Sequence, residues 1–184
     1  MIYIVRHGQT DWNVLGKIQG ITNIPLNDKG REQAEEVKVQ LQDVHFDAVF
    51  TSPLDRALDT ASIIAPNAHV IIDDRLLERS YGGVEGSLKI ALPALRKLNS
   101  DQALGIESIK SVRERIDEFC TEIEEKYQNK NVLVVTHAAV IAFARVYFEG
   151  EPKDHDYIGL VPDNCEVLKY NNRKKVKSLN MEQK

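Results

Sequence analysis

Apolar residues occur along this chain in two recurring patterns, which predict strands and helices in alternation. Short runs of apolar and β-branched residues are typical of buried strands, and they occur at Ile2–Val5, Phe46–Thr51, Val70–Ile72 and Val132–Val135. Between these runs, apolar residues return every three or four positions, as they do on one face of a helix. These stretches predict helices that open at Asn27-Asp28, Ser52-Pro53, Ser108 and Ala138.

The starts of two of these helices carry specific signals. Ser52 is expected to be the N-cap of its helix, with Pro53 in the first turn. Ser108 is expected to cap the long helix that follows it. The segment of residues 75–105 has no regular period, and its glycines indicate loops.

Strands that alternate with helices predict an α/β domain, a three-layer sandwich in which helices flank a mostly parallel central sheet. Near the C-terminus, two strand-like runs around Asn171-Asn172 predict a hairpin of Cys165–Tyr170 and Val176–Leu179. The length of 184 residues is that of one ordinary domain. Because 42% of the residues are hydrophobic, they are enough to form its core. We therefore expect a single domain over residues 1–184.

Charge and hydropathy exclude several classes of protein. The net charge of −4, with both signs scattered along the chain, argues against a nucleic-acid partner, which would need a basic face. The one dense basic run, Arg173-Lys174-Lys175, is interpreted as a solvated turn. No stretch approaches the roughly 20 apolar residues of a membrane span, and the first residues do not resemble a signal peptide. We expect a cytoplasmic protein with no membrane partner.

Residues that usually bind metals are few and scattered. Cys120 and Cys165 lie far apart in the sequence, and no Cys/His cluster with the spacing of a metal site occurs. Cys120 falls on the apolar face of a predicted helix, where a thiol is expected to be buried. We therefore expect neither a metal nor a cofactor.

Reactive side chains follow the predicted strands. Arg6-His7-Gly8 comes directly after the first strand, and Arg56 lies in the first turn of the helix after the second. Glu78 follows the third strand by a few residues, and His137 follows the fourth. In a parallel sheet the carboxyl ends of the strands meet at one edge, where ligands bind. We expect these side chains to converge there.

This set of side chains suits a phosphate group. A phosphomonoester carries close to two negative charges, and arginine offers a planar fork of donors that binds two of its oxygens. The start of a helix adds backbone N–H groups and a partial positive charge. A histidine nitrogen can attack phosphorus, and a carboxylic acid such as Glu78 can protonate the leaving oxygen.

Five motifs occur in a fixed order over about residues 1–170. They are Arg6-His7-Gly8-Gln9-Thr10 with Trp12-Asn13, Pro25-Leu26 with Gly30 and Gln33-Ala34, Thr51-Ser52-Pro53-Leu54 with Arg56-Ala57 and Thr60-Ala61, Leu77-Glu78-Arg79 with Gly82, Glu85 and Gly86, and Val134-Val135-Thr136-His137. Together they resemble the histidine phosphatase superfamily, also called phosphoglycerate mutase-like, in its small phosphatase branch. The Arg-His-Gly triplet alone is weak evidence, whereas the ordered set is specific.

The resemblance implies a phosphoglycerate mutase-like fold, a short cap region and a role for each matching residue. His7 would be the nucleophile that becomes phosphohistidine, and Glu78 would be the general acid and base. The residues that would contact the phosphoryl group are Arg6, Thr10, Asn13, Gly20, Arg56, His137 and Ala138. The family needs no metal.

Two departures from the family pattern leave the reacting groups in place. Ala138-Ala139 stands where the family commonly has two glycines, and an alanine keeps its backbone N–H. Gly105-Ile106-Glu107-Ser108 replaces a common Gly-Gly-Glu-Ser. Glu85 lies in the same loop region as Glu78 and is the alternative for the acid.

The length of the region before His137 favours hydrolysis. About 50 residues separate Gly86 from His137, where mutases of the family carry a longer insertion, and an open site admits water. We expect a short cap at about residues 80–107 and a metal-independent phosphatase. The alternatives are a phosphoglycerate mutase and a non-catalytic phosphate-binding module.

The partner is expected to be a small phosphorylated metabolite of unspecified identity. Specificity is expected to lie in residues 80–105 and near His155. Lys89, Arg96 and Lys97 are interpreted as solvated helix charges, with a contact to a second anionic group as the alternative. A homodimer is left open.

Overall fold

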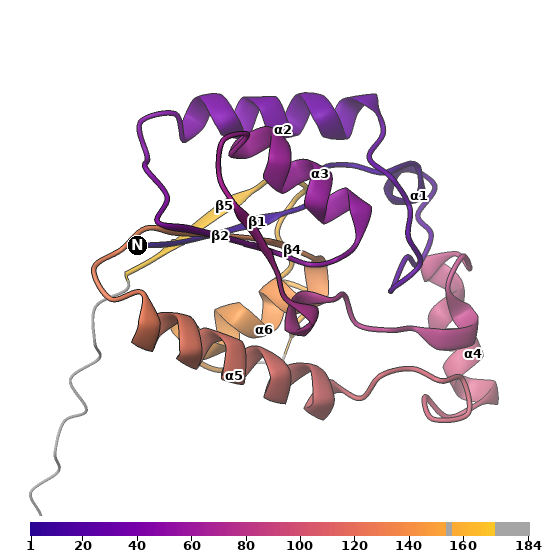
Figure 1. The fold of residues 1–184 in the computed structure, drawn as a ribbon. Helices are drawn as coiled ribbons and strands as arrows, with labels where there is room; N and C mark the ends of the chain where they lie inside the picture. The colour runs from indigo at the N-terminus through magenta and orange to yellow at the C-terminus, as the bar shows by residue number, and fades with distance from the viewer. Residues whose placement is uncertain (154–155, 172–184) are drawn as a thin grey trace, which may run out of the picture.

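The structure is a computed structural model that describes residues 1–153 and 156–171, and a five-stranded sheet lies at its centre (Figure 1). The order of the strands across the sheet is β3-β2-β4-β1-β5. Their bounds are β1 Ile2–Arg6, β2 Ala48–Thr51, β3 Val70–Ile72, β4 Val132–Thr136 and β5 Val167–Tyr170. Each bound lies within two residues of the predicted run.

The first four strands are parallel, and β5 runs antiparallel to β1 at one edge of the sheet. The predicted, mostly parallel sheet is therefore confirmed. Three further predictions fall on positions outside the described residues. These are the second strand of the hairpin at Val176–Leu179, the basic run at Arg173-Lys174-Lys175, and His155.

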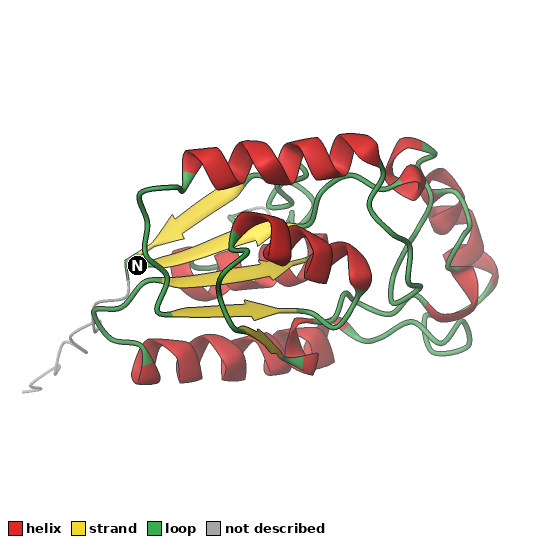
Figure 2. Ribbon diagram, turned by 45° about the horizontal axis from the view of Figure 1, so that its top comes forward, coloured by secondary structure: helices red, strands yellow, loops and turns green. Residues whose placement is uncertain are grey.

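Helices cover both faces of the sheet and complete the predicted three-layer sandwich (Figure 2). The helices on one face are α2 Asp28–Gln40 and α3 Asp55–Ile64, and those on the other are α5 Ile109–Lys126 and α6 Ala138–Glu149. The predicted start of α2 and the predicted cap of α5 are confirmed. The Asn27 side chain accepts the N–H of Gly30 at 2.9 Å, and the Ser108 side chain accepts the N–H of Ser111 at 3.0 Å.

Successive side chains of a strand point to opposite faces of the sheet, and β1 shows how this produces two cores. Ile2 and Ile4 pack with residues of α5 and α6, whereas Tyr3 and Val5 pack with residues of α2 and α3. Because both faces are covered, the strand is apolar at every position and shows no alternation. Cys120 is buried in the core under α5, as predicted.

The segment between β3 and α5 contains short helices in place of the irregular loop that the sequence predicts. Their bounds are η1 Asp74–Leu76, η2 Gly82–Val84, η3 Lys89–Ala91 and α4 Leu92–Leu98. With α1 Asp11–Val14, this segment lies beyond one end of the sheet, at the right of Figure 1. A small third core of Ile18, Val84 and Ile106 joins it to the loop after α1.

The predicted start of α3 is wrong. The helix begins at Asp55 with Leu54 as its N-cap, so both Ser52 and Pro53 precede it. The buried Ser52 hydroxyl lies 2.8 Å from Nε2 of His137, which is a partner on another segment. The same hydroxyl also accepts the N–H of Leu54, the N-cap, at 3.3 Å, so Ser52 holds the turn before α3 and contacts His137 at the same time.

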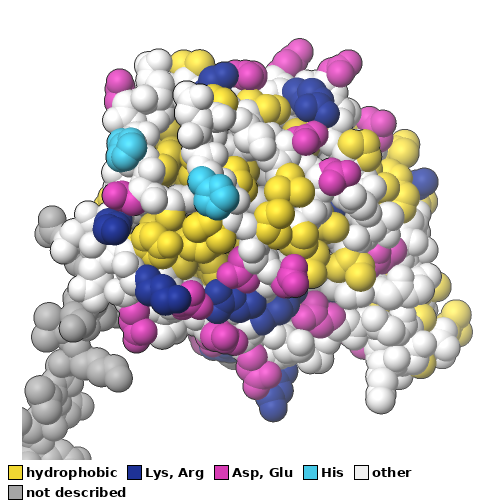
Figure 3. Space-filling model, viewed as in Figure 1, with side chains coloured by type: hydrophobic (Ala, Val, Ile, Leu, Met, Phe, Trp, Pro, Cys, Tyr) yellow, Lys and Arg dark blue, Asp and Glu magenta, His cyan; other side chains and the backbone are white. Residues whose placement is uncertain are grey.

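The edge strand β3 lies under an exposed apolar band. On the face drawn in Figure 3, hydrophobic side chains gather between the α2–α3 layer and a row of acidic and basic side chains along α5. Ile72, at the end of β3, is 55% exposed. Within residues 1–153 and 156–171, none of the helices combines the length and hydropathy of a membrane span.

Candidate active site

The two predicted catalytic histidines lie side by side because their strands are neighbours. β1 pairs with β4 so that Arg6 lies opposite Thr136, and the N–H of His7 donates to the carbonyl of Thr136 at 2.9 Å. His137 follows Thr136 directly. The two imidazole rings lie with their centroids 5.2 Å apart and their planes at 56°.

The tautomer of His7 is fixed by its own loop. Nδ1 lies 2.7 Å from the carbonyl oxygen of Gly8, and a carbonyl can only accept a hydrogen bond, so Nδ1 carries the proton. The neutral ring therefore has its lone pair on Nε2. Nε2 is therefore the ring nitrogen that is available for the nucleophilic role predicted for His7.

The surroundings of His7 keep the ring neutral. The side chain is 2% exposed, and this burial lowers its pKa well below the usual value of 6.5. The positive charges of Arg56 and Arg6 lower the same pKa further. An unprotonated imidazole is the form that can attack phosphorus.

The loop that carries His7 is packed tightly against α2 and α3. A side chain at Gly8 would overlap the backbone carbonyl of Gly30 in α2. The N–H of Gly8 donates to Oγ1 of Thr60 at 3.0 Å, and the same hydroxyl donates to the carbonyl of Arg56 at 2.6 Å. One threonine thus links the loop that follows His7 to Arg56.

Arg56 is buried, and backbone carbonyls hold its guanidinium. Nη1 donates to the carbonyl of Thr22 at 2.8 Å, and Nη2 donates to the carbonyl of Gly20 at 2.7 Å. Burial lowers the pKa of Arg56 to about 10, and the Glu78 carboxylate acts in the opposite direction. The side chain therefore stays positively charged at neutral pH.

Arg6 is held by the chain that leads into β5. Its Nη1 donates to the carbonyl of Pro162 at 2.7 Å, and its own carbonyl accepts the N–H of Cys165 at 3.0 Å. Burial lowers the pKa of Arg6, and the charge of Glu78 opposes this. The positive charges of two arginines, one in β1 and one in α3, thus act on His7.

Three buried side-chain nitrogens in the described part of the chain lack a hydrogen-bond partner. They are Nε of Arg6, Nε of Arg56 and Nδ1 of His137. Buried polar groups are nearly always hydrogen-bonded, so such exceptions indicate strain or a functional site. All three belong to side chains predicted to contact the phosphoryl group.

The loop between β1 and α2 contains the short helix α1, which the sequence reasoning missed. Thr10 caps this helix: its side chain accepts the N–H of Asn13 at 3.2 Å, and its N–H donates to Oδ1 of Asn13 at 3.0 Å. A threonine followed three residues later by a polar side chain is the available sequence signal. Asn164 donates to the carbonyl of His7 at 2.8 Å, also unforeseen.

Glu78 belongs to the same site. It is buried, and its Oε1 accepts the N–H of Arg79 at 2.9 Å and that of Ala139, in the first turn of α6, at 3.2 Å. The start of α6 therefore binds the carboxylate. The charge of Glu78 acts on Arg6 and Arg56, which places it within electrostatic reach of both.

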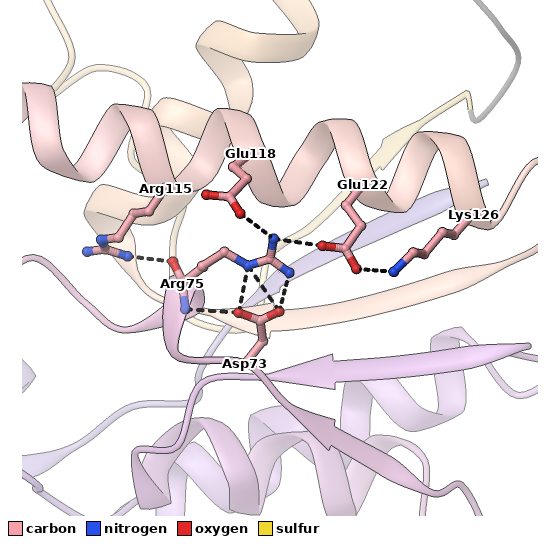
Figure 4. Close-up of polar contacts among 6 residues, drawn as sticks. All are labelled: Asp73, Arg75, Arg115, Glu118, Glu122 and Lys126. Carbon is pink, nitrogen blue, oxygen red and sulfur yellow. Dashed lines mark hydrogen bonds and ion pairs between the residues drawn. The ribbon is translucent and has the colours of Figure 1, made fainter.

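An ion-pair network fixes the segment that leads to Glu78 (Figure 4). Arg75 donates to both oxygens of Asp73, with a shortest distance of 2.6 Å, and to Glu122 of α5 at 2.8 Å. Arg115 of α5 donates to the carbonyl of Arg75 at 2.5 Å. These contacts attach η1 to α5 and so limit the positions open to Glu78.

The alternative acid, Glu85, has a different environment. Its carboxylate accepts three backbone N–H groups, those of Ile21 at 3.1 Å, Thr22 at 2.9 Å and Tyr81 at 2.9 Å. Both oxygens of Glu85 are thus occupied by donors of the surrounding loops, which leaves neither oxygen free to reach a leaving group. This observation favours Glu78 as the acid.

The other predicted phosphate contacts lie in the segment between β1 and α2 and at the start of α6. The carbonyl of Gly20 accepts a hydrogen bond from Arg56, and Ala138 is the first residue of α6. The Thr10 hydroxyl lies 3.0 Å from Oε1 of Gln19. Their contacts to phosphate, and that of Asn13, stay predictions.

Of the three cations considered for a second anionic group, Lys89 is the one whose charge acts on His7 of the site. Burial and the charge of Arg6 lower the pKa of Lys89, and Glu78 opposes this. Lys89 also contributes to the lowered pKa of His7. Arg96 forms an ion pair with Asp101 at 2.7 Å, and the side chains of Lys89 and Lys97 are both exposed.

No group of three or more His, Cys, Asp or Glu side chains that could bind a metal ion occurs among residues 1–153 and 156–171.

A sequence model of the histidine phosphatase superfamily, branch 1, matches residues 2–181. The chain belongs to the histidine phosphatase superfamily. The resemblance inferred from the motifs is confirmed.

Relatives in the superfamily include phosphatases and mutases. The chain is 38% identical over 143 residues to the uncharacterised phosphatase PhoE of Bacillus subtilis (strain 168), covering 76% of this chain and 72% of that protein. It is 31% identical over 176 residues to the 2,3-bisphosphoglycerate-dependent phosphoglycerate mutase of Cytophaga hutchinsonii, covering 87% and 83% respectively.

A solved structure supports the same assignment. Phosphoserine phosphatase from Entamoeba histolytica, in complex with 3-phosphoglyceric acid, superposes with a TM-score of 0.77 at 30% identity. The match covers 90% of this chain and 87% of that one. The phosphoglycerate mutase-like fold is thereby confirmed, and the comparisons support a phosphatase of this superfamily.

Proposed function

We propose that this chain is a metal-independent phosphatase that hydrolyses a small phosphomonoester through a phosphohistidine on His7. The observation that carries the proposal is the state of His7: a buried, neutral ring whose Nδ1 donates to Gly8 and whose Nε2 keeps its lone pair. The positive charges of Arg6 and Arg56 act on this ring.

In the first step, Nε2 of His7 attacks phosphorus, and the bond between phosphorus and the leaving oxygen breaks. The protonated carboxyl group of Glu78 gives its proton to that oxygen, which leaves as an alcohol. In the second step, the Glu78 carboxylate takes a proton from water as the water oxygen attacks phosphorus. The phosphorus–nitrogen bond breaks, and free phosphate and the neutral His7 return.

The clamp on the phosphoryl oxygens is assigned to Arg6, Arg56 and His137, with Asn13 beside them. Fixed donors that point at developing negative charge stabilise a transition state without reorganising. Thr10, Gly20 and Ala138 are proposed to complete this pocket through a hydroxyl or backbone groups. The unpartnered nitrogens of both arginines and of His137 support this assignment.

The substrate is proposed to be a small metabolite with a second anionic group. Residues 80–107 are proposed to act as the cap, and Lys89 lies within this segment. The lowered pKa of Lys89, caused by burial and by Arg6, supports a position facing the site. The complex of the Entamoeba histolytica phosphatase contains 3-phosphoglyceric acid, which has both a phosphate and a carboxylate.

The alternative is a phosphoglycerate mutase, which transfers the phosphoryl group from His7 to a hydroxyl of phosphoglycerate. The Cytophaga hutchinsonii relative favours this alternative. The shortness of the proposed cap favours hydrolysis, because water then reaches the phosphohistidine. A non-catalytic binding module is the weakest alternative, because His7, Arg56 and His137 are all present.

The test uses p-nitrophenyl phosphate and a panel of small phosphomonoesters, with EDTA present and His7→Ala in parallel. Phosphate release by wild type but not by the variant supports the proposal. Isomerisation of phosphoglycerate that depends on a bisphosphoglycerate primer, without net phosphate release, establishes the mutase. Full activity of His7→Ala refutes the mechanism.

A further inference from the structure

Glu85 is disfavoured as the acid, yet its carboxylate forms several hydrogen bonds that have no assigned role. Its Oε1 accepts the N–H groups of Ile21 and Tyr81, and its Oε2 accepts the N–H of Thr22. The Thr22 hydroxyl donates to the same Oε2. One carboxylate thus joins the loop after α1 to the segment proposed as the cap.

The turn that Glu85 binds, Gly20–Thr22, is also the turn that binds Arg56. The carbonyl of Thr22 accepts Nη1 of Arg56 at 2.8 Å, and the carbonyl of Gly20 accepts Nη2 at 2.7 Å. The N–H groups of the turn thus point to Glu85 while its carbonyls point to Arg56. The Gly20 carbonyl and the Ile21 N–H belong to one planar peptide unit, so the bond from that N–H to Glu85 also fixes the direction of the Gly20 carbonyl. Thr22, whose carbonyl contacts Nη1 of Arg56, is held to Glu85 by its own N–H and hydroxyl.

Gly20 shows how closely the carboxylate approaches this turn. The residue has a φ of 53°, a backbone conformation that residues other than glycine rarely adopt. A Cβ at this position would overlap Oε1 and the carboxyl carbon of Glu85. The glycine therefore leaves space for the carboxylate against the backbone.

We propose that Glu85 is a positioning residue, which holds the Gly20–Thr22 turn so that the two carbonyls aim the Arg56 guanidinium at the phosphoryl group. The proposal rests on the proposed function, because it takes Arg56 as a phosphate ligand. The charge of Glu85 also acts on the buried guanidinium and favours its protonated form. Because the N–H of Tyr81 also donates to Glu85, the same carboxylate connects the cap segment to the turn that binds Arg56.

The proposal predicts a pairwise dependence that a general structural role would not produce. Glu85→Gln places an NH2 group where two of the N–H donors now find an oxygen, so it loosens the turn. Arg56→Lys keeps a positive charge, but an ammonium lacks the fork that spans both carbonyls. Without the guanidinium, the conformation of the turn should have little effect on phosphate binding.

The test is the affinity for inorganic phosphate, measured by isothermal titration calorimetry on wild type, both single variants and the double variant. We expect Glu85→Gln to weaken binding about tenfold in wild type, and by less than about twofold in Arg56→Lys. Thr22→Val removes only one donor to Glu85. It should therefore weaken phosphate binding by less than Glu85→Gln does, and again by less in Arg56→Lys than in wild type.

Glu107→Gln is the matched control. Glu107 lies in the cap segment and also accepts several hydrogen bonds, from Ser80, Ser111 and Arg115, yet none from the turn. Its variant should lower thermal stability, and its effect on phosphate affinity should be the same with and without Arg56→Lys.

An equal loss of affinity from Glu85→Gln in both backgrounds overturns the positioning role, and so does an unchanged affinity in wild type. If Arg56→Lys alone leaves phosphate affinity unchanged, the phosphate-binding role of Arg56 in the proposed function is refuted first, and the positioning role is refuted with it.

Discussion

Replacing Glu78 with glutamine should separate the two chemical steps. A glutamine has nearly the same shape, and its carbonyl oxygen can still accept the N–H groups of Arg79 and Ala139 that now bind Oε1. The phosphate clamp keeps its contacts, and the transferable proton is lost. General acid–base catalysis contributes roughly 10²–10⁴-fold, which corresponds to about 3–5 kcal/mol in the activation free energy.

The size of the effect should depend on the leaving group. An alkyl phosphate needs the proton, so both steps slow and turnover falls by about 10²–10⁴-fold. p-Nitrophenolate leaves without a proton, so Glu78→Gln should release one equivalent of it rapidly and then turn over slowly. Hydrolysis of the phosphohistidine still lacks its base in that variant.

Rapid-mixing kinetics measures this burst, and the protein should carry an acid-labile, base-stable phosphoryl label at the same time. Glu85→Gln is the contrasting variant, because a loosened clamp slows both substrates and produces no burst. If Glu85→Gln shows the burst and Glu78→Gln does not, the acid has been assigned to the wrong carboxylate. An alkyl phosphate hydrolysed at the wild-type rate by Glu78→Gln would refute general acid catalysis by that residue.

Three further results are expected. Burial lowers the pKa of His7 below its unfolded value of about 6.5, so protons favour the unfolded chain and stability is lost as the pH falls below about 6.5. Urea unfolding between pH 7 and 5 should therefore show wild type losing up to about 1.4 kcal/mol per pH unit relative to His7→Gln, whereas a constant difference would mean that His7 titrates alike in both states. Lys89→Met should raise KM about tenfold for substrates with a second anionic group and hardly for p-nitrophenyl phosphate, with Lys97→Met as control; an equal rise for both substrates would contradict the assigned contact. Ile116→Ala, in the fully buried core under α5, should reduce the free energy of unfolding by about 2–5 kcal/mol, and a loss below about 1 kcal/mol would indicate that the core closes around the smaller side chain.

The layers and the edge that carries the site could be predicted because they depend on local patterns. Continuous apolar runs such as Val132–Val135 are typical of strands that are covered on both faces. Residues directly after such strands, His7 and His137 among them, must then meet at one edge. The motifs strengthened this expectation, because each adds its own residues to the same edge.

The parts that could not be predicted depend on contacts between distant segments. Ser52 has the local signature of an N-cap, but its hydroxyl is bound to His137, 85 residues later in the sequence, and α3 starts at Asp55. Asn164 holds the carbonyl of His7 across 157 positions and has no local signal at all. Lys89 looks like a solvated charge in the sequence, whereas in the fold its pKa is lowered by partial burial and by the charge of Arg6, a residue of a distant segment.

The arginines of the site serve two requirements with one charge. Phosphate binding needs positive charge beside the reacting phosphorus, and attack on phosphorus needs a histidine without a proton. The charges of Arg6 and Arg56 favour both, because they attract the phosphoryl group and lower the pKa of His7 together with its burial. A site with the same net charge from protonated histidines would bind phosphate and lack the nucleophile. Burial and the two arginines together keep His7 neutral, so a change in either arginine should alter both the affinity for phosphate and the pH at which His7 becomes protonated.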